Sequence, residues 1–569
     1  MLTIKKHIAD KLYEKYSALV PAPTLTADEL AGFLEYPPDD KLGDLAFPCF
    51  KLSKELRKAP PAIASTLADG LSDEVIGSAT AVGGYLNIKI SPAYFAGLIP
   101  EIIEKGEKYG SFDFGNGKTI VLDYSSPNVA KPFHIGHLGT TVIGHSLKML
   151  HEFVGYKCVG INHLGDWGTQ FGKLIVAYKK WGSKEDVEKR GITALTEIYV
   201  RFHKEAEQDE SLNDEAREAF VKLEHHDEEC YALWKWFIEI SIKEFKKTCD
   251  LIGASFESWL GESFYFDKTD SVINALREKN LLVLDDGAQV VRLDEYGMNP
   301  CLILKSNGST IYATRDIAAA IYRYDTYHFD KCIYVTSAGQ SLHFAQFFKV
   351  LELMGYDWAK NLVHVPFGTV SIEGGKLSTR EGNIVLLEDI FSEAIRKTLE
   401  IMNVKNPGLE NKEEVAKAVG VGAVIFHDLS NSRIKDVNFV WDEVLNFEGN
   451  TGPYVQYTYA RCAGITDKAN HTIDLSKFSI TNEFERDLMR TLNDFPSKVN
   501  QARDELEPSI ISRYLLEVCQ SFNRFYHDCP VLKVEDETVK NTRIALVSAT
   551  AAVLKNGLSL ICLKTPKNI

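Results

Sequence analysis

The sequence lacks the features that mark a secreted, zinc-bound or membrane protein. Its ten cysteines are scattered and no two have the CxxC spacing, so neither a disulfide framework nor a zinc site is expected. No apolar run is long enough to cross a bilayer. Residues 1–20 mix charged and apolar side chains at helical spacing, unlike a signal peptide. These absences predict a cytoplasmic protein without a membrane segment or a metal cage.

The sequence also has fewer basic than acidic residues, 64 against 79, which gives a formal net charge of -15. Such a balance argues against a surface that is a nucleic-acid clamp throughout. After position 450 the balance is nearly even, with 15 basic and 14 acidic residues, so a local basic face is possible there. Charge alone neither establishes nor excludes an RNA partner.

What the sequence does have is a change of pattern along its 569 residues, enough for three or four domains. Residues 1–113 mix helical patterns with short strands such as 85–90. Buried-strand patterns at 119–124, 158–162, 332–336 and 362–365 then alternate with helical ones, which predicts a doubly wound parallel sheet. The predicted division is 1–113 as an N-terminal domain, 114–390 as the parallel-sheet domain with an amphipathic helical insertion at about 183–253, 391–450 as a connecting stem, and 451–569 as a helical domain.

The first motif that carries chemistry follows strand 119–124, in the loop that leads to a helix expected at about 136–154. In a parallel sheet this loop lies at the carboxyl edge, where ligands bind. His134 and His137 are three residues apart and can share one face of the helix start, where free N–H groups and the helix dipole suit phosphate. Gly136 lets a nucleotide approach the backbone closely. The motif therefore predicts a triphosphate site.

Other interpretations of the histidine pair stay open at this point. Two surface histidines at a helix start are about as common an explanation for so short a motif. A metal pair is disfavoured, because no third ligand and no glutamate of the HExxH kind accompanies it.

A second motif is the glycine-flanked basic loop GGKLSTREGN at 374–383. Its glycines permit a mobile backbone, and Lys376 and Arg380 can reach phosphate. Alone, such a loop is usually an ordinary basic surface loop. Its order after the histidine motif favours a shared nucleotide site.

Together the two motifs resemble the HIGH and KMSKS sequences of class I aminoacyl-tRNA synthetases. The segments DYSSPNVAKPFHIGHLG, NHLGDWGTQFGKL, YATRDIAAAIYRYDTYHFDK and GNTGPYVQYTYARC resemble arginyl-tRNA synthetases. GDLAFPCFKLSKELRKAPPAIA resembles that family's N-terminal additional domain, so the resemblance covers nearly the whole chain. Two positions depart from it: the second lysine of KMSKS is missing, because residues 376–380 read KLSTR with Thr379 in its place, and the family is thought to compensate with a lysine before HIGH, here Lys131; Gly139 stands where many relatives have arginine.

The resemblance implies an α/β fold: a Rossmann-like parallel-sheet catalytic domain of the class I synthetase type, with an α+β tRNA-binding N-terminal domain and an all-α anticodon-binding C-terminal domain. It implies ATP-dependent ligation of L-arginine to tRNA(Arg) through arginyl-adenylate, by a monomer that needs bound tRNA for the first step. Mg²⁺ is expected to accompany ATP, held by phosphate and water. The implied catalytic residues are Lys131, His134, His137 and Lys376, and the implied ATP-binding residues are His134, Gly136, His137, Lys376 and Ser378.

An arginine site needs carboxylates for the guanidinium and polar groups for the α-amino and carboxylate ends. The resemblance implies that Tyr312 and Asp316, one helical turn apart, face the substrate and that Asp316 receives the guanidinium. On spacing alone, a helix-face pair with a structural salt bridge to Arg315 or Arg323 is the commoner arrangement. The full set of implied arginine-binding residues is Asp123, Asn128, Glu262, Tyr312, Asp316 and Gln340, of which Glu262 could equally cap a loop.

For tRNA, the resemblance and the aromatic content point to Tyr85, Asn87, Tyr454 and Tyr459, because aromatic rings can stack on splayed bases. A core aromatic stripe explains any single one of these tyrosines at least as well. Two other functions are alternatives: a nucleotidyltransferase of the HxGH type, and a non-catalytic tRNA-binding paralogue. The helical tail opposes the first, and the intact histidine and lysine motifs oppose the second.

Overall fold

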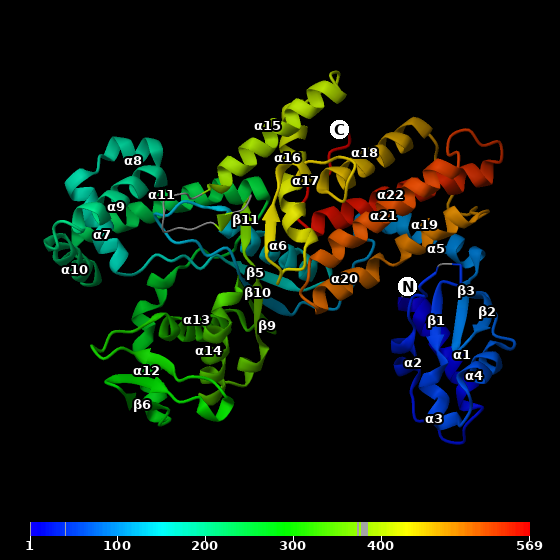
Figure 1. The fold of residues 1–569 in the computed structure, drawn as a ribbon, viewed down its shortest axis with the longest axis horizontal. Helices are drawn as coiled ribbons and strands as arrows, with labels where there is room; N and C mark the ends of the chain where they lie inside the picture. Colours follow the sequence, from blue (N-terminus) through cyan, green and yellow to red (C-terminus); the bar gives the residue numbers. More distant parts are fainter. Residues whose placement is uncertain (1, 40, 373–374, 377–384) are drawn as a thin grey trace.

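The computed structural model describes residues 2–39, 41–372, 375–376 and 385–569. The N-terminal body, blue in Figure 1, is a three-stranded antiparallel sheet in the order β1-β3-β2 with helices packed against it. Strand β3 coincides with the strand expected at 85–90. The elements are α1 (Leu2–Ser17), α2 (Ala27–Phe33), β1 (Leu45–Pro48), α3 (Ser53–Leu56), α4 (Pro60–Ala68), β2 (Ile76–Val82), β3 (Tyr85–Ile90) and α5 (Pro92–Lys105).

The catalytic sheet has the order β10-β9-β4-β5, and every pairing within it is parallel. The chain crosses from β4 to β5 through α6, then returns to the other side of β4 and adds β9 and β10. The strand order therefore reverses between β4 and β9, which is where a parallel sheet opens a crevice at its carboxyl edge. The elements are β4 (Thr119–Asp123), α6 (Leu138–Phe153), β5 (Lys157–Ile161), α13 (Tyr312–Tyr327), β9 (Lys331–Ser337), α14 (Ser341–Leu353) and β10 (Leu362–Phe367).

Two insertions extend from this sheet (Figure 1). The first is helical and ends at Gly253, whose left-handed φ of 86° stops the last helix. It comprises α7 (Thr169–Trp181), α8 (Lys184–Arg190), α9 (Ile192–Ala206), α10 (Ser211–Glu224) and α11 (Glu228–Ile252). The second comprises α12 (Thr269–Glu278) and the antiparallel strands β6 (Leu282–Asp285), β7 (Ala288–Val291) and β8 (Cys301–Leu304).

The C-terminal part is a helical bundle preceded by a stem that carries a small sheet, β12-β11-β13. The stem elements are β11 (Val370–Ile372), β12 (Gly375–Lys376), α15 (Leu387–Lys405), α16 (Lys412–Ser430), β13 (Val437–Phe439) and α17 (Trp441–Val444). The bundle helices are α18 (Gly452–Ala469), α19 (Glu483–Asn493), α20 (Phe495–Asp504), α21 (Ser509–Asp528) and α22 (Glu537–Leu560). The predicted fold class, a parallel-sheet α/β domain with a helical C-terminal domain, is confirmed.

The N-terminal body docks onto the C-terminal bundle through a buried ion pair. Both oxygens of the fully buried Asp44 lie 2.8 Å from Nη1 of Arg486 on α19, and Oδ2 also accepts the Ile90 N–H at 2.7 Å. The Tyr36 hydroxyl donates to Asp494 at 2.8 Å across the same junction. These contacts fix the two bodies to each other.

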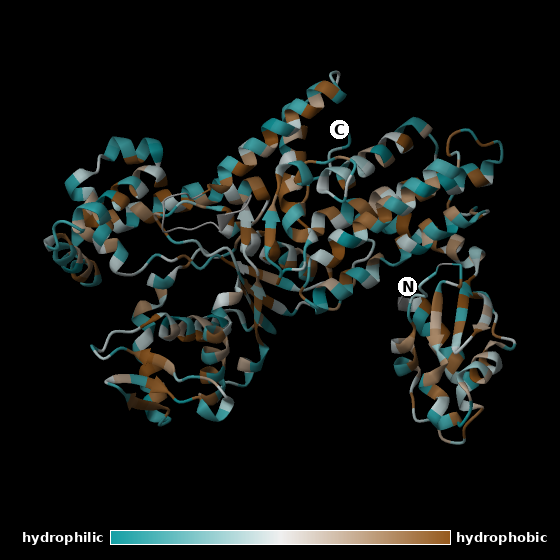
Figure 2. Ribbon diagram, viewed as in Figure 1, coloured by the Kyte–Doolittle hydropathy of each residue, from teal (hydrophilic) through white to brown (hydrophobic). Residues whose placement is uncertain are grey.

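Hydropathy follows the amphipathic pattern expected of packed helices, with hydrophilic and hydrophobic residues alternating along most of them (Figure 2). Within the described ranges, no helix combines the length and the apolar character that a bilayer crossing needs.

Candidate active site

The loop between β4 and α6 has a strained backbone at the carboxyl edge of the sheet. Ser125, Ser126 and Ala130 have left-handed φ angles of 74°, 49° and 59°, which cost non-glycine residues about 1–3 kcal/mol each. The surrounding structure holds this shape: the Ser125 N–H donates to the Thr140 hydroxyl, and the Ala130 N–H donates to the Ser241 hydroxyl, both at 3.0 Å. Helices α6 and α11 therefore fix the approach to the histidine motif.

His134 and His137 lie together at the start of α6, with ring centroids 4.0 Å apart. Nδ1 of His134 accepts the Gly136 N–H at 3.1 Å, and Nδ1 of His137 accepts the His134 N–H at 3.2 Å. A neutral imidazole that accepts at Nδ1 must carry its proton at Nε2. The His137 ring also stacks on Phe133 at 4.9 Å. Both histidines are thus oriented as Nε2–H donors by the backbone of their own turn.

Burial keeps both imidazoles neutral. It lowers the pKa of His137 to about 3, with the neighbouring His134 adding to the effect. Burial also lowers the pKa of His134, assisted by the charge of Lys131. Neutral N–H donors at a helix start suit an anionic ligand such as phosphate.

The segment just after the second motif pairs directly with the first motif. His134 forms an antiparallel bridge with Leu386, and the Ile135 N–H donates to the Val385 carbonyl at 3.2 Å. The backbone of Lys376 pairs with Ser371 in the β11–β12 ladder. Ser378 and Arg380 lie outside the described residues. The structure therefore anchors the segment that follows the lysine loop against the histidine motif.

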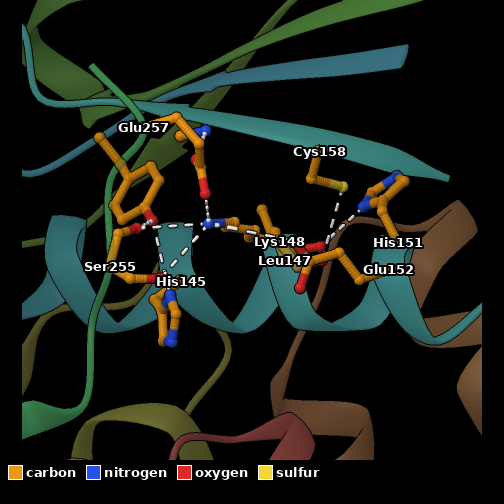
Figure 3. A network of polar contacts seen from close by, with 10 residues as sticks. His145, Leu147, Lys148, His151, Glu152, Cys158, Ser255 and Glu257 are labelled. Carbon is orange, nitrogen blue, oxygen red and sulfur yellow. Dashed lines mark hydrogen bonds and ion pairs between the residues drawn. The ribbon is translucent and has the colours of Figure 1, made fainter.

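A buried lysine ties α6 to the chain that leaves the helical insertion (Figure 3). The Lys148 side chain is 3% exposed, and its Nζ lies 2.6 Å from Oε1 of Glu257. The other carboxylate oxygen of Glu257 accepts the Gly160 N–H of β5 at 2.6 Å. The Tyr124 hydroxyl donates to the Ser255 carbonyl at 2.8 Å. Helix α6, strand β5 and residues 255–257 are therefore held as one unit behind the histidine motif.

On the other side of the switch point, α13 presents the predicted arginine-binding residues. Tyr312 is exposed at its first turn, and Asp316 follows one turn later. Asp316 is paired with neither Arg315 nor Arg323; its Oδ2 accepts from Nε2 of His343 on α14 at 2.7 Å. The structural salt bridge considered for this helix face is therefore absent at Asp316.

Glu262 lies beside this group and pairs with Arg315 at 3.0 Å. Burial raises the pKa of Glu262, and the positive charge of Arg315 opposes that rise. Gln340 ends the short 3₁₀ turn Ala338–Gln340 before α14 and is exposed. The structure thus gathers Glu262, Asp316 and Gln340 around the start of α13 and α14.

Asp123 and Asn128 occupy different settings in the loop after β4. Oδ2 of Asp123 lies 2.8 Å from the fully buried Arg323, and its Oδ1 accepts the Ser126 hydroxyl at 2.9 Å. Asn128 is exposed and pairs with Gly165, so close that a Cβ at Gly165 would lie 2.2 Å from the Asn128 amide oxygen. Asp123 is therefore engaged by protein groups, whereas Asn128 borders the open edge.

The residues expected to contact tRNA differ in accessibility. The Tyr85 side chain is 38% exposed and packs edge-on against Phe50, whereas Asn87 is 3% exposed. Tyr459 belongs to the core, and the Tyr454 hydroxyl accepts from the Asn523 amide at 2.9 Å. Tyr459 is therefore a packed core residue, as in the alternative that explains the tyrosines by an aromatic stripe in the core.

His343 is a site residue that was not among those expected from the sequence. Its position, three residues after Gln340 and so on the same face of a helix start, is the signal that could have found it.

Three family models match the chain in succession. The arginyl tRNA synthetase N terminal domain matches residues 2–90, the class I (R) tRNA synthetase catalytic domain matches 98–441, and the DALR anticodon binding domain matches 455–569.

Similar proteins match over nearly their full length. An arginine–tRNA ligase from Alkaliphilus metalliredigens is 52% identical over 95% of this chain and 96% of its own. One from Clostridium perfringens is 51% identical over 98% of both chains. The solved Thermus thermophilus arginyl-tRNA synthetase shares the fold, with a TM-score of 0.81 at 24% identity over 99% of this chain and 100% of that one. The family matches and the similarity to these ligases together show that the chain belongs to the arginyl-tRNA synthetase family.

Proposed function

We propose that the chain joins L-arginine to tRNA(Arg) in two steps at the crevice between β4 and β9, the first of which consumes ATP. As a member of its family, it is a class I arginine–tRNA ligase. The observation that carries the site assignment is the pair of preset Nε2–H donors of His134 and His137 at the switch point of the sheet. Carboxylates suited to a guanidinium lie on α13 (Asp316) and on the 3₁₀ turn Glu262–Lys268 (Glu262).

In the first step, the arginine carboxylate attacks the α-phosphate of ATP, which gives arginyl-adenylate and pyrophosphate. The two histidines donate to phosphate oxygens as charge develops on them, and one such donor contributes about 3 kcal/mol. Lys131 and Lys376 supply positive charge, and Gly136 allows close approach of the nucleotide; Ser378 completes the proposed ATP-binding set. In the second step, the terminal 2′-hydroxyl of the tRNA attacks the activated carbonyl and releases AMP.

Mg²⁺ fits this scheme as an ion carried by the nucleotide. No cluster of three or more histidine, cysteine or acidic side chains suitable for a metal occurs in the described chain. When bound with ATP, Mg²⁺ neutralises phosphate charge and is held mainly by phosphate oxygens and water.

The proposed arginine site uses Asp316 and Glu262 for the guanidinium and Tyr312 and Gln340 along the side chain. Asn128 and Asp123 are assigned to the α-amino group of the arginine. The contacts of Asp123 with Ser126 and Arg323 fix the position of its carboxylate. Asp316→Ala should chiefly weaken arginine binding. An unchanged arginine KM in that variant would contradict the guanidinium assignment.

The tRNA is proposed to contact both flanking bodies, with Tyr85 as the exposed candidate in the N-terminal body and Tyr454 in the bundle. Asn87 and Tyr459 are buried, so their proposed role is to support these surfaces from within the fold. The enzyme is proposed to act as a monomer in the cytoplasm. The ten unpaired cysteines support a reducing compartment.

The decisive experiment is arginine-dependent ATP–pyrophosphate exchange, measured with and without tRNA(Arg). Exchange with arginine and tRNA, together with transfer of labelled arginine to the tRNA, is the expected result. An HxGH nucleotidyltransferase would not depend on arginine, and a non-catalytic paralogue would bind tRNA without exchange. Equal exchange with cysteine or glutamate would contradict the substrate assignment.

A further inference from the structure

We propose that His343 is a positioning residue for arginine recognition, which holds the Asp316 carboxylate so that its second oxygen faces the substrate guanidinium. This inference rests on the proposed function, because it assigns a role within the same arginine site. His343 would not touch the reacting atoms; it would act through Asp316.

The contact itself is short and partly shielded from solvent. Nε2 of His343 lies 2.7 Å from Oδ2 of Asp316, and the two side chains are 18% and 26% exposed. Since a carboxylate has only acceptors, the imidazole donates. Among the described residues, no hydrogen bond is made to Oδ1 of Asp316. One oxygen is therefore committed to the protein and the other remains available to a ligand.

The imidazole is held in place before any substrate arrives. Its ring packs edge-on against Tyr312 with centroids 5.1 Å apart, and it contacts Phe347 at 5.3 Å. Tyr312 belongs to α13 and Phe347 to α14, so the ring is clamped between the two helices that border the site. A donor fixed in this way restricts the rotation of Asp316 about its own side-chain bonds. Such preorganisation lowers the cost of ordering the carboxylate when the ligand binds.

The neighbouring charges leave Asp316 free for a guanidinium from outside. Arg315 is adjacent on the same helix, but it is committed to Glu262 at 3.0 Å. The next arginine on α13, Arg323, is buried against Asp123. The arginines of α13 are thus paired with other carboxylates, and Asp316 is left with a histidine donor. This partition is what a site for a substrate guanidinium requires.

A purely structural role for His343, as a link between α13 and α14, predicts different behaviour and can be separated from the proposal. His343→Leu keeps apolar bulk but removes the donor, whereas His343→Gln retains an N–H near the position of Nε2. In tRNA-dependent exchange, His343→Leu should raise the arginine KM by about tenfold or more, the effect of losing one hydrogen bond to a charged group. Its kcat and its ATP KM should change by less than about threefold, because the phosphate contacts are remote. His343→Gln should restore most of the arginine affinity.

Three further measurements make the outcome decisive. In an Asp316→Asn background, His343→Leu should have no additional effect on the arginine KM, since the partner it orients is already altered. Phe348→Leu, which perturbs the same helix at a ring that packs against Tyr334, Phe344 and Phe347, is the matched control and should leave the arginine KM near that of the wild type. If His343→Leu does not fold, His343→Asn replaces it, because its amide nitrogen lies near the position of Nδ1 and cannot reach Asp316.

An equal rise in the KM for arginine and for ATP would overturn the inference. So would a loss confined to kcat, or the same effect of His343→Leu in the Asp316→Asn background. If the wild-type enzyme shows no arginine-dependent exchange at all, the proposed function itself fails. If the wild type is active and the His343 variants bind arginine normally, only the role of His343 is refuted.

Discussion

A buried carboxyl beside the histidine helix should make the protein measurably less stable as the pH rises. Asp428 of α16 is 8% exposed, and its Oδ2 has no hydrogen-bond partner in the described chain. That oxygen lies 3.8 Å from the point where a Cβ at Gly139 would stand, at the second residue of α6. Burial raises the pKa of Asp428 to about 7, against 3.8 as its reference value. The folded state therefore retains a proton that the unfolded chain releases.

The sign and size of the effect follow from proton linkage. Below about pH 4 both states are protonated and the carboxyl adds no pH dependence. Between pH 4 and pH 7 only the folded state binds the proton, so the free energy of unfolding falls by about 1.4 kcal/mol per pH unit, or about 4 kcal/mol in total. Asp428→Asn cannot ionise, so this loss should disappear, although the amide keeps a burial cost of about 1–3 kcal/mol. The variant should be the more stable protein at pH 8 and the less stable one at pH 4.

Hydrogen exchange of the α16 amides is the suitable assay, because a chain of several domains does not unfold in a single two-state step. After correction for intrinsic exchange, wild-type protection should fall between pH 5 and pH 8 relative to Asp428→Asn. Asp442→Asn, which removes an exposed carboxyl on the neighbouring α17, should leave the wild-type trend unchanged. A pH trend identical in wild type and Asp428→Asn would refute the reasoning.

Three other expectations concern the helix that starts at the histidine motif. Glu257→Gln should lower the free energy of unfolding by roughly 2–3 kcal/mol, and more than Lys148→Met. It leaves a buried ammonium whose other carboxylate partner, Glu152, lies 3.9 Å away, whereas Glu257 itself is 46% exposed to water. Denaturation midpoints of the two variants give the order, and a larger loss for Lys148→Met would contradict it. His137→Ala should lower kcat by about a hundredfold with little change in the arginine KM, as expected for a hydrogen-bond donor used in the transition state. Pyrophosphate exchange measures both constants. A rise in the arginine KM alone would point to a binding role. Gly144→Ala should destabilise the protein by about 1–3 kcal/mol, because its Cβ would lie 2.3 Å from the Tyr124 side chain; an unchanged thermal midpoint would show that α6 can move away from β4.

Secondary-structure elements that depend on the order of neighbouring residues could be predicted from the sequence. The strand at 85–90 coincides with its predicted position, because strand-forming side chains and flanking glycines act within a few residues. The helix expected from about 136 begins at Leu138, after a 3₁₀ turn that His134 caps. A capping histidine is uncommon, so the pattern gave no warning of it.

The partners within the site could not be predicted, because they come from distant parts of the chain. Asp123 meets Arg323 across 200 positions, and Asp316 meets His343 on a different helix. Spacing along one helix suggested Arg315 or Arg323 for Asp316, but the fold commits both to other carboxylates. Burial is similarly invisible in a motif: nothing local distinguishes the exposed Tyr85 from the core residue Tyr459.

The junction of Asp44 with Arg486 has a mechanical consequence. It joins the N-terminal body directly to the C-terminal bundle, so the placement of these two bodies does not depend on the catalytic sheet. An RNA that touches both bodies therefore meets a frame whose span is set by the protein alone. An RNA longer or shorter than that span would have to bend in order to reach both bodies.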